Sequence, residues 1–175
     1  MTYVESTLAS GEKILLRANF NWTYSFGPTL WFAIGLSPAV MLAVIQFGGG
    51  ITFEALAVGW YAAAGAALLG TLILINHVIL LWTTEIIVTT YRFVYKQGLI
   101  ARKAQEVSLN KIEEINLSQS IFGRIFGYGQ LTLRGTGVGV IELPNLDSPI
   151  KVRRTIENAK ADLRRSGLEE FRGEE

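Results

Sequence analysis

The stretches PTLWFAIGLSPAVMLAVIQF (residues 28–47) and ALAVGWYAAAGAALLGTLILINHVILLW (residues 55–82) decide the fold of this chain. Each is long enough to cross the ~30 Å of hydrocarbon in a bilayer, which takes about 20 apolar residues. A glycine-rich break, Gly48–Gly50, separates them, and all sixteen Lys and Arg residues lie outside Ala18–Tyr91. The pattern predicts a transmembrane helical hairpin over residues 28–82.

Basic residues on both sides of the hairpin predict its orientation. Lys13 and Arg17 precede the first span, Arg92 and Lys96 follow the second, and the connecting loop carries no basic residue. Because positive charge concentrates on the cytoplasmic side, both termini are expected in the cytoplasm. The domain organisation expected on this basis is an N-terminal cytoplasmic or interfacial segment (1–27), the hairpin (28–82), a folded domain (83–167) and a disordered acidic tail (168–175).

Small residues recur every four positions in both spans and form a candidate helix-packing seam: Gly35, Ala39, Ala43, Ala62, Ala66 and Gly70. Such stripes let two helix backbones approach closely in lipid. We expect them to pack the two helices of one hairpin, and the alternative is a seam between copies of the chain.

His77, the single histidine, follows Asn76 near the end of the second span. We expect an interfacial residue with a satisfied hydrogen bond, and the alternative is a proton-linked or headgroup role. The sequence leaves open whether this pair lies in the membrane or in a helical stalk.

The segment after the hairpin predicts short strands followed by one helix. Val, Ile, Thr and Tyr dominate from Glu85 onward, with breaks at Gly98 and at Arg134–Gly137. Ser148 and Pro149 then predict the start of a helix that Gly167 ends. Its apolar face would hold Val152, Ile156, Ala159 and Leu163. The fold class expected is α+β, with a small barrel or sandwich capped by the C-terminal helix.

Five basic residues early in this domain form a candidate surface for lipid headgroups or a partner: Lys96, Arg102, Lys103, Lys111 and Arg124. Cations near an anionic leaflet each gain roughly 1 kcal/mol. Because Glu106, Glu113 and Glu114 lie nearby, we expect a solvated face that orients the domain, and headgroup binding is the alternative.

The segment SQSIFGRIFGYG (residues 118–129) places four large apolar residues around Arg124: Ile121, Phe122, Ile125 and Phe126. We expect these side chains to fill the core of the small barrel. In the alternative they dip into the membrane interface.

The sequence contains no pattern of a catalytic site. Residues Gly135–Gly139 match neither common phosphate-loop template. Glu113 and Glu114 are adjacent, so on a strand they point to opposite faces and cannot form a paired-acid site. With no Cys and one His, no nucleophile triad or clustered metal site is expected, and neither is a cofactor.

The stretch from Val88 to Leu133, VTTYRFVYKQGLIARKAQEVSLNKIEEINLSQSIFGRIFGYGQLTL, resembles the bacterial pleckstrin-homology-like (PH-like) domain of the second type, found in YdbS-like membrane proteins. The matching elements are Thr89 with Arg92, Gly98, the Leu109–Ile112 step with Lys111, the Gln119–Gly123 turn and the Gly127-Tyr128-Gly129 run. The resemblance covers about Thr84–Ala159, and the two spans match the family's usual anchor. It implies a strongly bent barrel of about seven strands closed by a C-terminal helix, and neither an enzyme nor a fixed ligand site.

Together these patterns predict a non-catalytic, membrane-anchored PH-like binding or scaffold protein of the bacterial inner membrane. Its expected partners are the lipid bilayer and either another membrane protein or further copies of the chain. The net charge of +1 argues against a nucleic-acid partner. The alternatives are anionic lipid headgroup sensing by the basic residues and an oligomeric transport or channel component.

Overall fold

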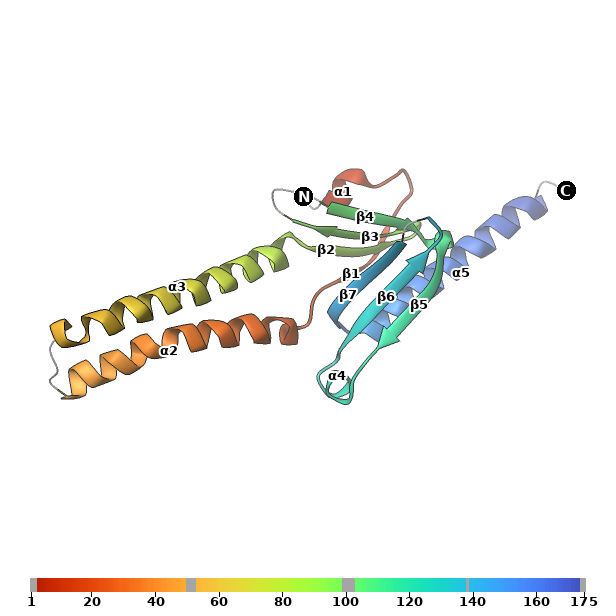
Figure 1. Cartoon of the computed structure of the whole chain (residues 1–175). Coiled ribbons are helices and arrows are strands. Elements are labelled where there is room, and N and C mark those ends of the chain that lie inside the picture. The colour runs from red at the N-terminus through yellow and green to blue at the C-terminus, as the bar shows by residue number, and fades with distance from the viewer. Residues whose placement is uncertain (1–2, 50–52, 99–102, 138, 174–175) are drawn as a thin grey trace. The chain divides into compact units, whose positions relative to one another are not determined.

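The computed structural model describes residues 3–49, 53–98, 103–137 and 139–173. The chain divides into two compact units, one of Ser25–Trp82 and one of Met1–Tyr24 together with Thr83–Glu175. The first unit is the helical hairpin, and the second contains the described strands (Figure 1). The predicted domain boundaries are therefore corrected, because the N-terminal segment is part of the folded domain.

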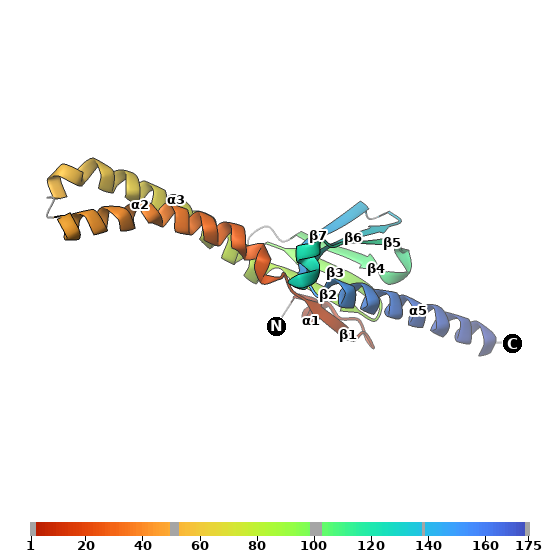
Figure 2. The same ribbon diagram turned by 90° about the horizontal axis from the view of Figure 1, so that it is seen from below.

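The hairpin consists of α2 (Phe26–Gly49) and α3 (Phe53–Thr83), which run antiparallel and side by side (Figures 1 and 2). Both predicted spans are confirmed as helices to within two residues at each end. Both are long and apolar enough to cross a membrane. Only 0% and 11% of their most apolar windows are buried, which is too little for the core helices of a soluble domain.

Two glycines allow α2 and α3 to approach closely. A Cβ atom on Gly35 would lie 2.6 Å from the carbonyl oxygen of Ala66, and one on Gly70 would lie 3.2 Å from Phe32 Cα. Ala39 and Ala43 are half-buried beside them. These contacts agree with the expected packing within one hairpin. Ala62, in contrast, is exposed, and its neighbour Ala63 is the buried residue of that turn.

His77 lies inside α3, which continues without a break through Asn76 to Thr83. Its Nε2 atom lies 3.1 Å from the hydroxyl oxygen of Ser25, at the other side of the hairpin. The expected hydrogen bond of this histidine is confirmed.

The described strands form two antiparallel sheets. The first has the order β1 (Ile14–Ala18), β2 (Glu85–Thr89), β3 (Arg92–Gln97) and β4 (Lys103–Ser108), and the second has the order β5 (Ile112–Ser118), β6 (Tyr128–Gly135) and β7 (Gly139–Asp147). A short 3-10 turn, η2 (Leu109–Lys111), leads the chain from one sheet to the other. Among the described residues the two sheets are linked by one isolated bridge, Phe20↔Leu146, so the strands form two sheets and a closed barrel is not seen.

The C-terminal helix α5 (Pro149–Gly173) lies against both sheets (Figure 2). Val152, Ile156 and Ala159 are buried in the main core, as predicted, and Leu163 packs at its edge. The predicted stop at Gly167 and the disordered tail are corrected, because α5 continues to Gly173. A glycine inside a helix costs only about 1 kcal/mol relative to alanine and does not by itself end the helix.

The N-terminal segment covers the outer face of the first sheet. Val4 of α1 (Tyr3–Thr7) forms a second buried cluster with Ile87 and Val94, while Ile86 and Val88 face the main core. Alternate residues of a strand point to opposite faces. The continuous apolar run of β2 is therefore explained by burial of this sheet on both sides.

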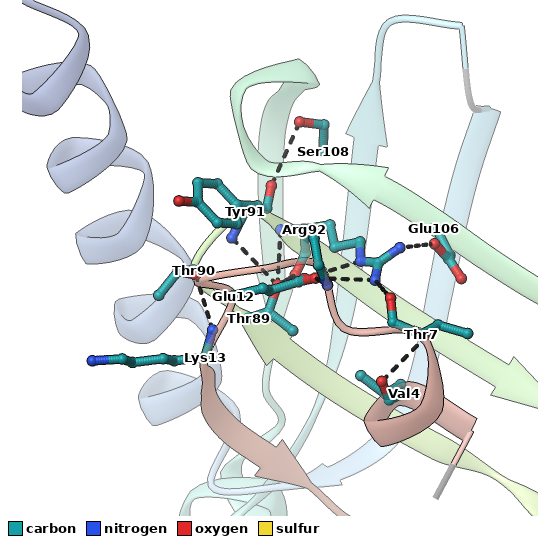
Figure 3. A network of polar contacts seen from close by, with 11 residues as sticks. Val4, Thr7, Glu12, Lys13, Thr89, Thr90, Tyr91, Arg92, Glu106 and Ser108 are labelled. Carbon is teal, nitrogen blue, oxygen red and sulfur yellow. Dashed lines mark hydrogen bonds and ion pairs between the residues drawn. The ribbon is translucent and has the colours of Figure 1, made fainter. Parts of the chain in front are cut away.

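A polar network joins this N-terminal segment to the β2–β3 turn (Figure 3). Glu12 accepts hydrogen bonds from Thr89 Oγ1 at 2.7 Å and from Arg92 Nε at 3.0 Å. The same guanidinium donates to Glu106 at 2.7 Å and to the carbonyl oxygen of Thr7 at 2.6 Å. Thr89 also accepts from the backbone N–H of Arg92, which fixes the turn. The Thr89 and Arg92 motif read from the sequence is therefore structural.

The carboxylate of Glu12 is held in its ionised form. Burial by itself would raise its pKa, but hydrogen bonds from Thr89, the backbone N–H of Ala9 and Arg92 outweigh that effect and place the pKa below its ordinary value. A carboxyl group with a lowered pKa stabilises the folded state above its ordinary pKa, and this contribution is lost as the pH falls through the folded-state value.

Glu12→Gln should lower the stability of the domain by about 1–3 kcal/mol at neutral pH, because Arg92 would lose its buried carboxylate partner. The measurement is thermal unfolding of the full chain in detergent, where each kcal/mol corresponds to roughly 2–4 °C. The difference from the unmodified chain should shrink below about pH 4. Glu142→Gln, at an exposed position of β7, is the control. Equal destabilisation by both substitutions would contradict the role assigned to Glu12.

Gly35→Ala should destabilise the hairpin by about 1–3 kcal/mol, since the added methyl group would collide with the Ala66 carbonyl of α3. Gly65→Ala is the matched control, because no atom lies within 4 Å of the position of its added Cβ. In detergent, the melting temperature of the control should equal or exceed that of the unmodified chain. The melting temperature of Gly35→Ala should be lower than that of the unmodified chain. The reverse order would show that the helices do not pack through this face.

Candidate functional site

The structure distributes the five predicted basic residues over different parts of the domain. Lys96 donates to Glu85 at 2.9 Å across the β2–β3 pair, and its side chain is only 13% exposed. Lys103 is exposed at the start of β4, Lys111 is exposed at the end of η2, and Arg124 is exposed in α4 (Ile121–Ile125). Arg102 lies outside the described residues.

Strand geometry keeps these cations from forming one patch. Lys111 precedes β5 and Arg124 follows it, so the seven residues of that strand separate them. At about 3.3 Å per residue this is a separation of roughly 20 Å. Lys103 and Lys111 agree with the expectation of a solvated face. Arg124 lies in a different part of the domain, among other basic residues.

Arg124 lines a groove between α4 and the first turns of α5. The groove has a volume of about 980 Å³, and its other basic residues are Lys151 and Arg154. Leu117, Gln119 and Pro149 form much of the remaining lining. Within the described part of the chain, none of the three cations has an acidic partner at ion-pair distance. We call this feature the basic groove.

Strand register brings the two walls of the basic groove together. Tyr128, just after α4, pairs with Asp147, just before α5, and the N–H of Ser148 donates to the carbonyl oxygen of Gly127 at 2.9 Å. A Cβ on Gly129 would lie 3.0 Å from Pro149 Cγ, so the glycine permits this close approach. The glycines of the Gly127-Tyr128-Gly129 run thus shape the groove.

The α4 turn is held by side-chain hydrogen bonds to its backbone. Ser120 caps its start by accepting from the Gly123 N–H at 3.0 Å, and Gln119 Nε2 donates to the carbonyl oxygens of Gly123 and Tyr128, each at 3.0 Å. These bonds satisfy backbone groups that a helix of five residues leaves without partners. The turn therefore has a defined conformation at the tip of the β5–β6 hairpin (Figure 1).

The apolar side chains of this turn face outward, which corrects the expectation that they fill the core. We call the following residues the α4 patch, with their exposed fractions: Ile121 77%, Phe122 66%, Ile125 69% and Phe126 47%. The core is instead closed by residues of both sheets and α5, among them Phe93, Leu131 and Ile156.

The α4 patch contacts the residue at which the first apolar span begins. The ring of Trp22, the first residue of the apolar stretch Trp22–Gly49, packs edge-on against Phe126, with centroids 5.8 Å apart. Asn21, which is buried, donates from Nδ2 to Asp147 at 3.0 Å and to the carbonyl oxygen of Phe126 at 3.3 Å. The segment before α2 is therefore fixed to the junction of α4, β7 and α5.

Sequence reasoning missed Lys151, Arg154 and Asn21. The first two lie three positions apart on the predicted helix, and such residues share a helix face, so their spacing was a usable signal. Their distance in sequence from Arg124 concealed the grouping. Asn21 gave no signal of its role, because Phe126 and Asp147, to which its side chain donates, lie more than 100 positions away.

Among the described residues there is no group of three His, Cys, Asp or Glu side chains that could hold a metal ion. The basic groove brings together three cations, apolar side chains and the polar side chains of Gln119 and Ser148. Such an arrangement suits an anionic group attached to an apolar body.

Comparisons with known proteins agree with the fold. The family model described as bacterial PH domain matches residues 32–160, which include most of the hairpin and the strands β2 to β7. The comparisons with curated proteins and with solved structures give no match. Since the matched region covers well over half of the chain, this protein belongs to the bacterial PH domain family.

Proposed function

We propose that this protein is a non-catalytic, membrane-anchored binding protein whose PH-like domain acts as a recognition domain at the inner leaflet of the bacterial cytoplasmic membrane. The hairpin would cross the membrane twice and leave both termini in the cytoplasm. The two sheets and α5 would correspond to the bent barrel and terminal helix of the PH-like fold. The family match and the two apolar helices support this proposal.

The observation that carries the proposal is the attachment of the hairpin to one sheet at both ends. β1 precedes α2, and β2 follows α3 after the single residue Thr84. These two strands are hydrogen-bonded neighbours, from Ile14↔Thr89 to Ala18↔Ile86. Both ends of the hairpin therefore continue into neighbouring strands of the same sheet. Such a connection suits a recognition domain that is kept at the membrane by its anchor.

The partner proposed is another membrane protein or a further copy of the chain, for which the domain acts as a scaffold or adaptor. Exposed apolar faces of α2 and α3 support this role. The second candidate is recognition of anionic lipid headgroups, which the basic groove beside the α4 patch favours.

The proposed topology predicts opposite accessibility of two single cysteines, and the chain contains no native Cys. Glu54→Cys, at the start of α3, should react with a membrane-impermeant maleimide on intact spheroplasts. Glu142→Cys, on β7, should react only after permeabilisation. Labelling of both positions, or of Glu142→Cys alone, on intact spheroplasts would contradict the proposed orientation.

The scaffold role predicts stoichiometric contacts in the native membrane. In-cell crosslinking followed by mass spectrometry should recover either one partner protein or intermolecular crosslinks of the chain. For self-association, oxidation should dimerise Ala62→Cys at an exposed position of α3, whereas Ala63→Cys, buried within the hairpin, is the control. Recovery of the chain alone and monomeric after crosslinking would refute this role.

A further inference from the structure

We propose that the α4 patch inserts into the headgroup region of the inner leaflet and that the basic groove beside it binds the phosphate group of an anionic phospholipid. This inference rests on the proposed anchoring of the domain at the membrane, and it names the ligand of the second candidate function. It assigns Lys151 and Arg154, together with Arg124, to that ligand.

The α4 turn exposes a large apolar surface. Four large side chains project from a turn of five residues whose backbone is fixed by Ser120 and Gln119. With successive residues about 100° apart on a helix, Ile121, Phe122 and Ile125 fall on one side of the turn. Arg124 falls on the other side and lines the groove. The turn therefore separates apolar from cationic groups, as interfacial membrane elements do.

The α4 turn contacts the segment that precedes α2. Phe126 packs against Trp22, and its carbonyl oxygen accepts from Asn21. Trp22 is exposed and begins the apolar span, which is the position at which tryptophan concentrates in membrane proteins. If Trp22 lies at the interface, its contact places Phe126 at the same depth. The α4 patch is thus in contact with an aromatic residue of the segment that precedes α2.

The basic groove carries three positive charges. Arg124, Lys151 and Arg154 converge on one cavity without an acidic partner at ion-pair distance among the described residues. Asp147, which precedes α5 beside the groove, already accepts hydrogen bonds from Asn21 and from Ser148. The arginine guanidinium presents a planar fork that matches phosphate oxygens. Cations at this depth favour an anionic leaflet over a neutral one.

The same features argue for lipid over a protein partner. Ile150, at the rim of the groove, is also exposed, so apolar surface borders the cations on both helices. A phospholipid offers a phosphate and an apolar body together, which fits this alternation.

The test measures the depth of α4 with a single label. Phe122→Cys is labelled with an environment-sensitive fluorophore, and the full chain is reconstituted in nanodiscs of phosphatidylcholine with or without phosphatidylglycerol. Val140→Cys is the control label, since it is also exposed but lies at the opposite end of the β6–β7 pair. Lipids carrying a quencher in the upper acyl chain report contact with the bilayer.

The expected result is a blue shift and quenching of the Phe122 label, stronger in the anionic discs, with the Val140 label unchanged. Replacing Arg124, Lys151 and Arg154 with Gln should weaken insertion roughly fivefold for each cation removed. Raising the salt concentration from about 0.05 to about 0.5 M should reduce the preference of the unmodified chain for anionic discs. This measurement needs no substitution, so it remains informative if the substituted chain fails to fold.

Four outcomes would overturn the inference. A label that stays in water in both discs would exclude insertion, and equal insertion in neutral and anionic discs would exclude recognition of an anionic phospholipid by the groove. A label that is shielded from water but not quenched by lipid would indicate a protein contact instead. Soluble inorganic phosphate added to neutral discs should not reproduce the anionic effect, and if it did, the ligand would be free phosphate. Cysteine accessibility at Glu54 and Glu142 in the same discs reports the topology separately.

Discussion

The antiparallel pairing of β1 with β2 is the constraint on which the rest of this structure depends. The two strands are separated by the whole hairpin in sequence, yet their backbones are hydrogen-bonded neighbours in one sheet. This pairing brings the two ends of α2 and α3 to the same sheet and makes the N-terminal segment part of the domain. The buried network of Glu12, Thr89 and Arg92 then secures the turn beside it.

A second set of contacts transmits this constraint to the candidate site. The segment after β1 is bonded to the β7–α5 junction through the Phe20↔Leu146 bridge and the side chain of Asn21. The α4 turn is bonded to the same junction through Gly127 and Ser148. The start of the apolar span, the α4 patch and the basic groove therefore belong to one rigidly connected region of the domain. A binding surface at a membrane gains from such preorganisation, because less conformational freedom is lost on contact.

Much of the fold could be predicted from local sequence patterns. The length and hydropathy of the two apolar stretches located both helices of the hairpin. The spacing of apolar residues at the helical period of 3.6 identified the buried face of α5, which includes Val152 and Ile156. The strands after the hairpin followed from composition and glycine breaks. The failures were long-range: Leu16 and Arg17 were assigned to a cytoplasmic or interfacial segment outside the folded domain, because their partners Val88 and Ile87 lie beyond the hairpin. Gly167 looked like a stop, because a local signal cannot report how far a helix continues.

The candidate site, like the fold, was predicted from local patterns only in part. The α4 segment was recognised as a motif, but its apolar side chains were expected in the core because hydrophobicity alone does not report which way a turn faces. Arg124 was identified and Lys151 and Arg154 were not, since the β6–β7 register brings them together and no local pattern records that register. The sequence by itself determined the two apolar helices, the strand-then-helix order and the family resemblance, because these depend on periodicity and composition along the chain. Only the tertiary structure decided which residues share the groove and which apolar side chains remain exposed, because both depend on contacts between segments distant in sequence.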